Sequence, residues 1–105
     1  MSNRFYLSKE KAHALATMTN DGFVVHAGST AMLNGSPRVK RDRPLRDKLV
    51  HDGVIIPHND ADLLRFSRDY CFDSPSAAAG VVKDGNSSGT NDWRDVSSGK
   101  KMSEL

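Results

Sequence analysis

Residues 72–93, FDSPSAAAGVVKDGNSSGTNDW, decide the fold of this chain because they contain a helix start, a helix stop and the only tryptophan. Ser74 can accept a hydrogen bond from a backbone N–H that a helix leaves unpaired, and Pro75 occupies a position that needs no donor. The three alanines that follow favour helix. We therefore predict a helix from Pro75 to about Lys83, ended by the glycines after it, and a short last strand around Trp93.

An antiparallel hairpin is expected earlier in the chain. Thr19–Gly22 supplies turn residues, and Phe23–Val25 is a run of strong strand formers. The segment before this turn is typical of the first arm of the hairpin, although its alanines around His13 would also suit a helix. Arg4–Leu7 alternates weakly and predicts a further short strand.

A second helix is predicted over residues 44–51. A proline suits its first turn, and Leu45 and Leu49 lie four residues apart on one face. Arg46 and Lys48 do not share the stripe formed by these leucines, so both are expected to point outward into solvent.

The remaining segments complete a small fold. Residues 30–37 are typical of an exposed loop, Val54–Ile56 of a short buried segment and Leu63–Phe66 of a strand. The expected fold class is α+β, with a small, mainly antiparallel β-sheet that includes the hairpin and packs against two short helices. We place a single domain at residues 1–95 and a flexible C-terminal tail at residues 96–105.

Size and composition limit the class of protein. At 105 residues the chain suffices for one small hydrophobic core. No apolar run approaches the length of a membrane-spanning helix, which predicts no membrane association. The N-terminus lacks the apolar stretch and cleavage site of a signal peptide, so a cytoplasmic protein is expected.

Few residues suggest catalysis. The single cysteine, Cys71, excludes an internal disulfide and a multi-cysteine zinc site, and we expect it to be buried and unreactive between Tyr70 and Phe72. The four histidines lie on different predicted elements without metal-ligand spacing. The sequence therefore predicts no catalytic residue, no metal and no cofactor, so we do not expect an enzyme.

A basic run offers the clearest candidate site. Asp42 and Asp47 are the only acidic residues within it, and its six basic residues are Arg38, Lys40, Arg41, Arg43, Arg46 and Lys48. Such a run suits contacts to DNA phosphates with little sequence preference. Taken alone, such a run is more often a solvated helix face.

Three further residues are candidates for a second contact surface. Ser74 and Ser76 stand where a helix N-terminus favours an anion, but Asp73 opposes an anion there and simple capping explains Ser74. Trp93 could stack on a base, whereas core packing is the more common role of a lone tryptophan in a small domain.

The chain also resembles a known family. The segments VVHAGST, RPLRDKLVHDGVI and LLRFSRDYCFDSPSAAAGVV, followed by Trp93, resemble the uncharacterised bacterial family called domain of unknown function 4357, over roughly residues 5 to 95. That family typically shows F-S-S-P-S-A-A-A where this chain has FDSPSAAA. It also carries an arginine in the run before its tryptophan, which DGNSSGTNDW lacks.

The resemblance implies a type of function. This family is similar to a module associated with restriction enzymes and adenine methylases, and its members tend to occur beside nucleases or DNA-modification enzymes. The resemblance thus implies a noncatalytic accessory module that binds DNA or senses its modification, with a nuclease or methylase as protein partner. The alternative hypothesis is a protein-interaction or oligomerisation module.

Overall fold

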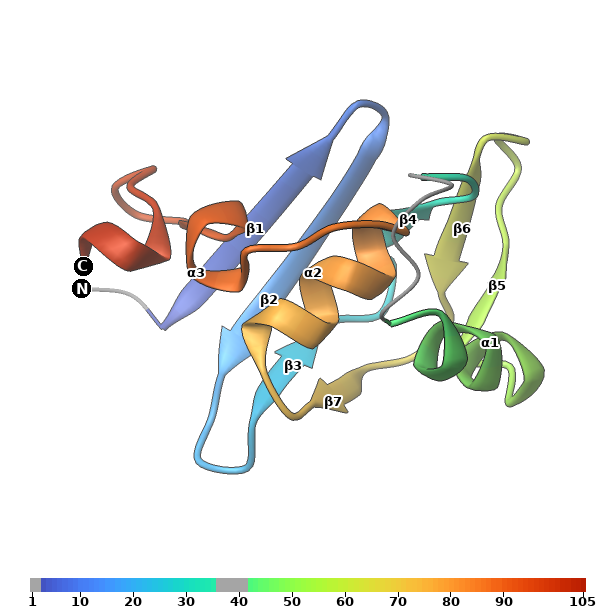
Figure 1. The fold of residues 1–105 in the computed structure, drawn as a ribbon, viewed down its shortest axis with the longest axis horizontal. Helices are drawn as coiled ribbons and strands as arrows, with labels where there is room; N and C mark the ends of the chain where they lie inside the picture. Colours follow the sequence, from blue (N-terminus) through green and yellow to red (C-terminus); the bar gives the residue numbers. More distant parts are fainter. Residues whose placement is uncertain (1–2, 36–41) are drawn as a thin grey trace.

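Two antiparallel sheets form the framework in the computed structural model, which describes residues 3–35 and 42–105 (Figure 1). The five-stranded sheet has the order β7-β3-β2-β1-β8 and the three-stranded sheet the order β4-β6-β5. The strands are β1 Arg4–Lys9, β2 Ala12–Met18, β3 Phe23–Val25, β4 Thr30–Met32, β5 Ile55–Pro57, β6 Leu63–Phe66, β7 Tyr70–Phe72 and β8 Arg94–Asp95. The helices are α1 Arg43–His51, α2 Pro75–Lys83, α3 Gly89–Asp92 and the 3₁₀-helix η1 Met102–Glu104. The predicted α+β class is confirmed.

The predicted hairpin is the pair β2 and β3. Its turn closes with hydrogen bonds between the backbones of Thr19 and Gly22, at 2.8 and 3.3 Å. Gly22 has a φ of +149°, and a Cβ at this position would lie 2.5 Å from the Phe72 carbonyl oxygen. The turn therefore needs glycine both for its backbone conformation and for the close approach of β7.

Strict alternation gives the five-stranded sheet two different faces. Along β2, Ala12, Ala14 and Ala16 are buried, whereas His13 and Leu15 between them are exposed. Phe5 and Leu7 of β1 pair with two of these alanines and join the same buried face. The small alanines leave room above the sheet for a helix to approach closely.

Helix α2 covers the buried face, with the bounds that the sequence predicts. The Ser74 hydroxyl accepts a hydrogen bond from the Ala77 N–H at 3.1 Å, as expected for an N-cap. Its buried residues are Ala78, Ala79, Gly80, Val81 and Val82. A Cβ on Gly80 would collide with the Asp42 carboxylate, so this glycine allows the start of α1 to lie against α2.

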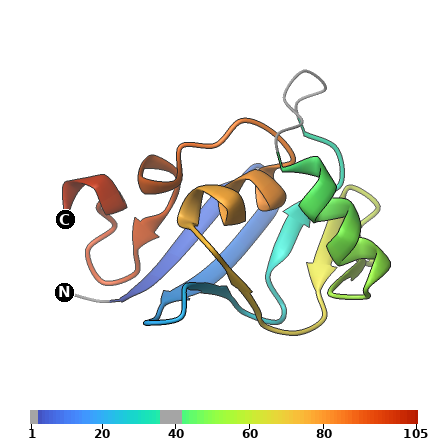
Figure 2. The same cartoon turned by 60° about the horizontal axis from the view of Figure 1, so that its bottom comes forward.

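Helix α1 also has the predicted extent and contacts both α2 and β5. Leu49 is buried in the common core, and Leu45 packs against that core. Figure 2 shows α1 and α2 on the same side of the strands. Among the described residues, no helix covers the opposite face of the five-stranded sheet, which we call the outer face.

The predicted loop over residues 30–37 is partly wrong. Thr30–Met32 is the strand β4, which pairs with β6 and buries Ala31 completely. A strand of three residues followed by Asn34-Gly35 offers too little alternation to be told from a loop. The end of the predicted loop lies outside the described residues.

The domain also extends beyond the predicted boundary at residue 95. Residues 96–105, expected to form a flexible tail, turn back so that the Met102 N–H donates to the Trp93 carbonyl at 2.9 Å. The Met102 side chain packs against the core. The buried Asp95 carboxylate accepts hydrogen bonds from the N–H and hydroxyl of Ser98, which closes the turn that brings the chain back.

The described part of the chain holds no helix that is both long enough and apolar enough to cross a membrane.

Candidate nucleic-acid interface

The structure separates the residues of the predicted basic run. Arg38, Lys40 and Arg41 lie outside the described residues. Lys48 is exposed on α1, so its predicted outward orientation is confirmed. The other two basic residues of the run, Arg43 and Arg46, have partners inside the protein.

Arg46 is buried, and the prediction that it points outward is wrong. Its side chain is enclosed by α2 and β4, and the residue is 3% exposed. Its guanidinium donates hydrogen bonds of 2.6–2.8 Å to the carbonyl oxygens of Met32, Leu33 and Val81. Arg46 is therefore a structural cross-link between α1, α2 and β4 and not a phosphate contact.

Asp84 is the counter-ion of this buried arginine. Its carboxylate lies 2.8 Å from Nη2 of Arg43 and 3.6 Å from Nε of Arg46, and it accepts a hydrogen bond from the Gly35 N–H at 3.0 Å. Burial lowers the pKa of the Arg46 guanidinium, and Arg43 adds to this, while the Asp84 charge opposes it. Arginine nevertheless stays protonated in proteins, so the Asp84 carboxylate pairs with two cations.

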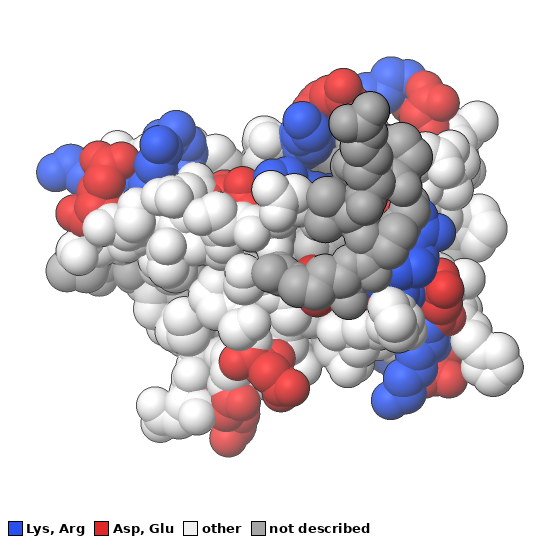
Figure 3. Space-filling view, viewed as in Figure 1, with Lys and Arg blue, Asp and Glu red and all other residues white. Residues whose placement is uncertain are grey.

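Cations and carboxylates both occur on the helix side of the molecule. In Figure 3 the described lysines and arginines lie in separate groups at the upper left, top and right, with carboxylates near them, and the lower edge carries carboxylates alone. Two of the lysines are ion-paired: Lys83 lies 3.0 Å from Asp92, and Lys11 contacts both Asp60 and Asp62. The described residues of this side thus form no continuous basic patch.

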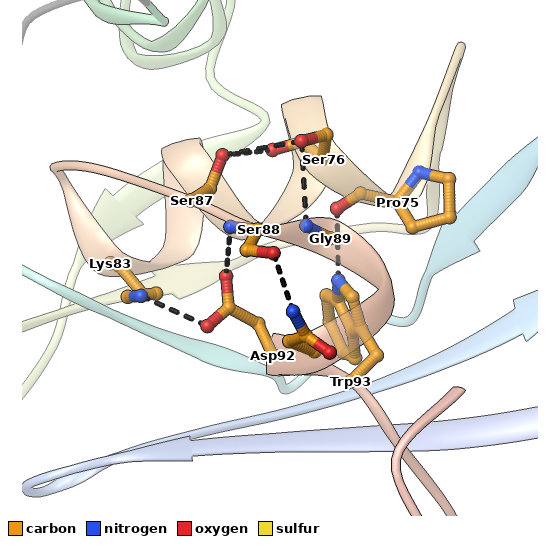
Figure 4. Close-up of polar contacts among 9 residues, drawn as sticks. Pro75, Ser76, Lys83, Ser87, Ser88, Gly89, Asp92 and Trp93 are labelled. Atoms are coloured by element: carbon orange, nitrogen blue, oxygen red, sulfur yellow. Dashed lines mark hydrogen bonds and ion pairs between the residues drawn. The ribbon is translucent and has the colours of Figure 1, made fainter. Parts of the chain in front are cut away.

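The proposed second contact surface does not include the tryptophan. Trp93 is fully buried, and its indole N–H donates to the Pro75 carbonyl at 3.0 Å (Figure 4). Its ring meets Phe23 edge to face at 4.8 Å between centroids. The core packing that the sequence favoured is confirmed, and the alternative that Trp93 contacts nucleic acid is wrong, because the buried tryptophan joins α2 to the sheet.

The serines at the start of α2 form hydrogen bonds with other residues of the protein. Ser74 caps the helix, and the Ser76 hydroxyl accepts from the Gly89 N–H at 3.4 Å and lies 3.5 Å from the Ser87 hydroxyl (Figure 4). They line an open pocket of about 370 Å³ with Ser88 and neighbouring residues of the loop. These contacts tie the loop before α3 to α2, which is a structural role.

Cys71 lies at the surface, contrary to the prediction. The strand β7 places Phe72 in the core and the neighbouring Cys71 on the outer face, opposite Val24. The expected burial followed from its aromatic neighbours, but alternation turns them to the other side of the strand. Within the described residues, no three His, Cys, Asp or Glu side chains gather in a way that could hold a metal ion.

The outer face gathers residues for which the sequence predicted no binding role. Strand register places Tyr6 between Arg94 and Leu15, and Ser8 beside His13. The rings of Tyr6 and His13 stack at 6.0 Å with an interplanar angle of 23°. Arg4, Thr17, Val24 and Cys71 form the adjoining row. The alternating alanines of HALATM are the sequence pattern that could have identified this face, since burial of the alanines places the intervening residues on the opposite side.

The Asp69 carboxylate lies beside the His26 ring at one border of the outer face. A hydrogen bond from the Ala27 N–H, together with the nearby His26 ring, lowers the pKa of the Asp69 carboxyl. Because the folded state has the lower pKa, this carboxylate stabilises the fold above the ordinary carboxyl range, and the contribution is lost as pH falls through the lowered pKa.

We expect Asp69→Asn to flatten the loss of stability in acid. Urea unfolding measured at a series of pH values should show a smaller decrease for this variant than for the wild type between about pH 5 and pH 2. Asp73→Asn, at another exposed carboxylate, is the control. If the stability of the wild type and of Asp69→Asn depended identically on pH, the stabilising role of the Asp69 carboxylate would be contradicted.

Comparison with known proteins assigns the chain at the level of a family. No curated protein and no solved structure matches it. Residues 5–105 match a domain of unknown function, DUF4357. The match begins within β1 and ends after η1, so it covers both sheets and the segment beyond residue 95. The chain therefore belongs to the DUF4357 family.

Proposed function

We propose that this domain is a noncatalytic module that binds the phosphate backbone of DNA. In this proposal it serves in the cytoplasm as an accessory to a nuclease or a DNA-modification enzyme and has a role in sensing modified DNA. The observation that carries it is the charge of residues 38–48 after the buried ion pairs are set aside. Arg38, Lys40, Arg41 and Lys48 then face only two carboxylates in this run, Asp42 and Asp47.

The buried ion pairs support this division of roles. Asp84 neutralises part of the charge of Arg43 and Arg46 and fixes the start of α1 against α2. Lys48 follows on the exposed side of the same helix. Phosphate binding by such residues is electrostatic, weak and dependent on salt, and it requires no catalytic group.

The test is a titration of fluorescein-labelled duplex DNA followed by anisotropy at several salt concentrations. We expect a dissociation constant in the range of about 10⁻⁴–10⁻⁶ M that weakens as salt rises. The triple variant R38A/K40A/R41A should bind more weakly. It should also lower the slope of log K against log salt by roughly one unit for each phosphate that the variant no longer neutralises.

A matched control removes the same number of positive charges elsewhere. The variant K9A/K11A/K100A changes three exposed lysines outside the basic run. Equal losses of DNA affinity in both triple variants would show that the loss follows from net charge alone. That result would reject the assigned interface. Absence of duplex binding even at low salt would reject DNA binding and favour the protein-interaction hypothesis.

A methylated duplex tests the sensing role. The same titration with and without adenine methylation should show a difference in affinity that is insensitive to salt, because a methyl group changes no charge. Equal affinities would remove modification sensing from the proposal and leave phosphate binding intact.

A further inference from the structure

The outer face of the five-stranded sheet has the composition of a base-stacking surface. Its outward residues are Arg4, Tyr6, Ser8, His13, Leu15, Thr17, Val24, Cys71 and Arg94. Among the described residues, no helix lies over them. These nine residues include one aromatic ring, one imidazole, apolar side chains and two arginines, and none of them is Asp or Glu, although His26 and Asp69 lie at the border beside Thr17.

The rings lie near the middle of this face. Tyr6 is half-buried and stacks on the exposed His13, with Leu15 directly opposite Tyr6 on the neighbouring strand. The two rings therefore hold each other in place before any ligand arrives. When a base stacks beside these rings, the protein side chains lose little further conformational freedom. The small entropic cost favours binding.

The arginines flank these rings. Arg94 is opposite Tyr6 on β8 and donates to the Gly99 carbonyl at 2.8 Å, which fixes its position. Arg4 lies at the start of β1, two residues before Tyr6. Beyond β2, the Thr30 hydroxyl accepts from the His13 N–H, and Arg65 pairs with Thr30 in the second sheet. Positive charge thus occurs on both sides of the ring pair.

We propose that the outer face binds single-stranded DNA, with bases stacked on Tyr6 and His13 and phosphates near Arg4, Arg94 and Arg65. This inference rests on the proposed function and specifies the form of DNA. A duplex keeps its bases stacked inside, whereas a single strand presents them to an open face with aromatic residues. A second copy of this chain is disfavoured as the occupant, because the nine outward residues include arginines and no carboxylate, so two outer faces would bring like charges together.

A matched pair of substitutions on one strand tests the surface. Leu15 and Met18 both belong to β2 and are 38% and 37% exposed, but alternation turns them to opposite sides. Leu15→Glu introduces a like charge for phosphate at the centre of the outer face. It should weaken binding of oligo(dT) of about 10 nucleotides, the size that small β-domains cover, by about tenfold or more, whereas Met18→Glu should change it less than about twofold.

Tyr6 provides the second measurement. Tyr6→Ala should weaken oligo(dT) binding about 5- to 150-fold, the range that one base–aromatic stack contributes, and Tyr6→Phe should retain it. Far-UV circular dichroism and thermal unfolding of each variant show whether the sheet persists. If Tyr6→Ala does not fold, Leu15→Glu and Tyr6→Phe still decide the result.

The outcomes separate this inference from the proposed function. Duplex binding that depends on residues 38–41, together with oligo(dT) binding unaffected by Leu15→Glu, would overturn the outer-face site and leave the proposed function standing. Tighter binding of oligo(rU) than of oligo(dT) would overturn the assignment to DNA. Dimerisation through this face, measured by sedimentation and abolished in Leu15→Glu, would also overturn it. Absence of binding to both duplex and single strand would reject both proposals.

Discussion

Replacement of Asp84 by alanine should lower the free energy of unfolding by about 3–5 kcal/mol, the typical loss when one partner of a buried ion pair is removed. The Asp84 side chain is 4% exposed, as is that of Arg46. Without the carboxylate, Arg43 and Arg46 would lose the buried partner that pairs with both of them, and the Gly35 N–H would lose its acceptor. A domain of this size has a total stability of about 5–15 kcal/mol, so much of the protein would be unfolded at elevated temperature.

Two further variants separate charge from backbone conformation. Asp84 adopts a left-handed conformation with a φ of +52° at the end of α2. Asparagine also tolerates this conformation, so Asp84→Asn removes only the charge. It should lower the free energy of unfolding by a measurable amount, but by less than Asp84→Ala. Urea denaturation followed by circular dichroism measures both losses of stability.

A surface ion pair is the matched control. Asp62 lies 2.8 Å from Lys11, the same separation as Asp84 from Arg43, but the two side chains are 68% and 58% exposed. Solvent screens such a pair, so Asp62→Ala should have a small effect. Comparable losses of stability for Asp62→Ala and Asp84→Ala would show that burial of the Arg46–Asp84 pair does not determine its contribution.

Local signals predicted the helices α1 and α2 and the hairpin of β2 and β3. Ser74 with Pro75 defined the start of α2, and Thr19–Gly22 defined the turn, because each acts through neighbours only a few residues away. These features depend on backbone hydrogen bonds and allowed φ values, which the chain specifies locally. Their positions in the structure match the prediction closely.

Contacts between distant residues could not be predicted in this way. Helical spacing set Arg46 beside the leucine stripe, but it did not show that α2 and β4 enclose that side of α1. Its counter-ion, Asp84, is 38 residues away in the sequence, in a segment that resembles an ordinary loop. An aspartate immediately after a helix, followed by glycine, was the local signal for a left-handed helix end. Nothing local indicated that its carboxylate would be buried.

For the candidate site, too, the sequence pattern identified residues but not their tertiary contacts. Composition identified the basic run, yet the tertiary fold assigns Arg43 and Arg46 to internal ion pairs and leaves Lys48 at the surface. The outer face could be identified only once the strand register was known, because Tyr6, His13 and Arg94 meet only when β1 pairs with both β2 and β8. A binding surface on a sheet therefore requires the topology as well as the pattern of residues.

Trp93→Ala should destabilise the domain by about 3–5 kcal/mol, as expected when a large buried aromatic side chain is truncated. The ring is fully buried against Phe23, and its N–H donates to the Pro75 carbonyl, so the variant loses both packing and a hydrogen bond. Trp93→Phe retains a ring but loses the N–H, and it should have the smaller effect. Circular dichroism must follow the unfolding, because both variants remove the only tryptophan fluorophore. DNA affinity per folded molecule should remain unchanged in Trp93→Phe, since a buried ring cannot stack on a base. A Trp93→Phe variant of normal stability that binds DNA about tenfold more weakly would instead restore the tryptophan to the binding surface.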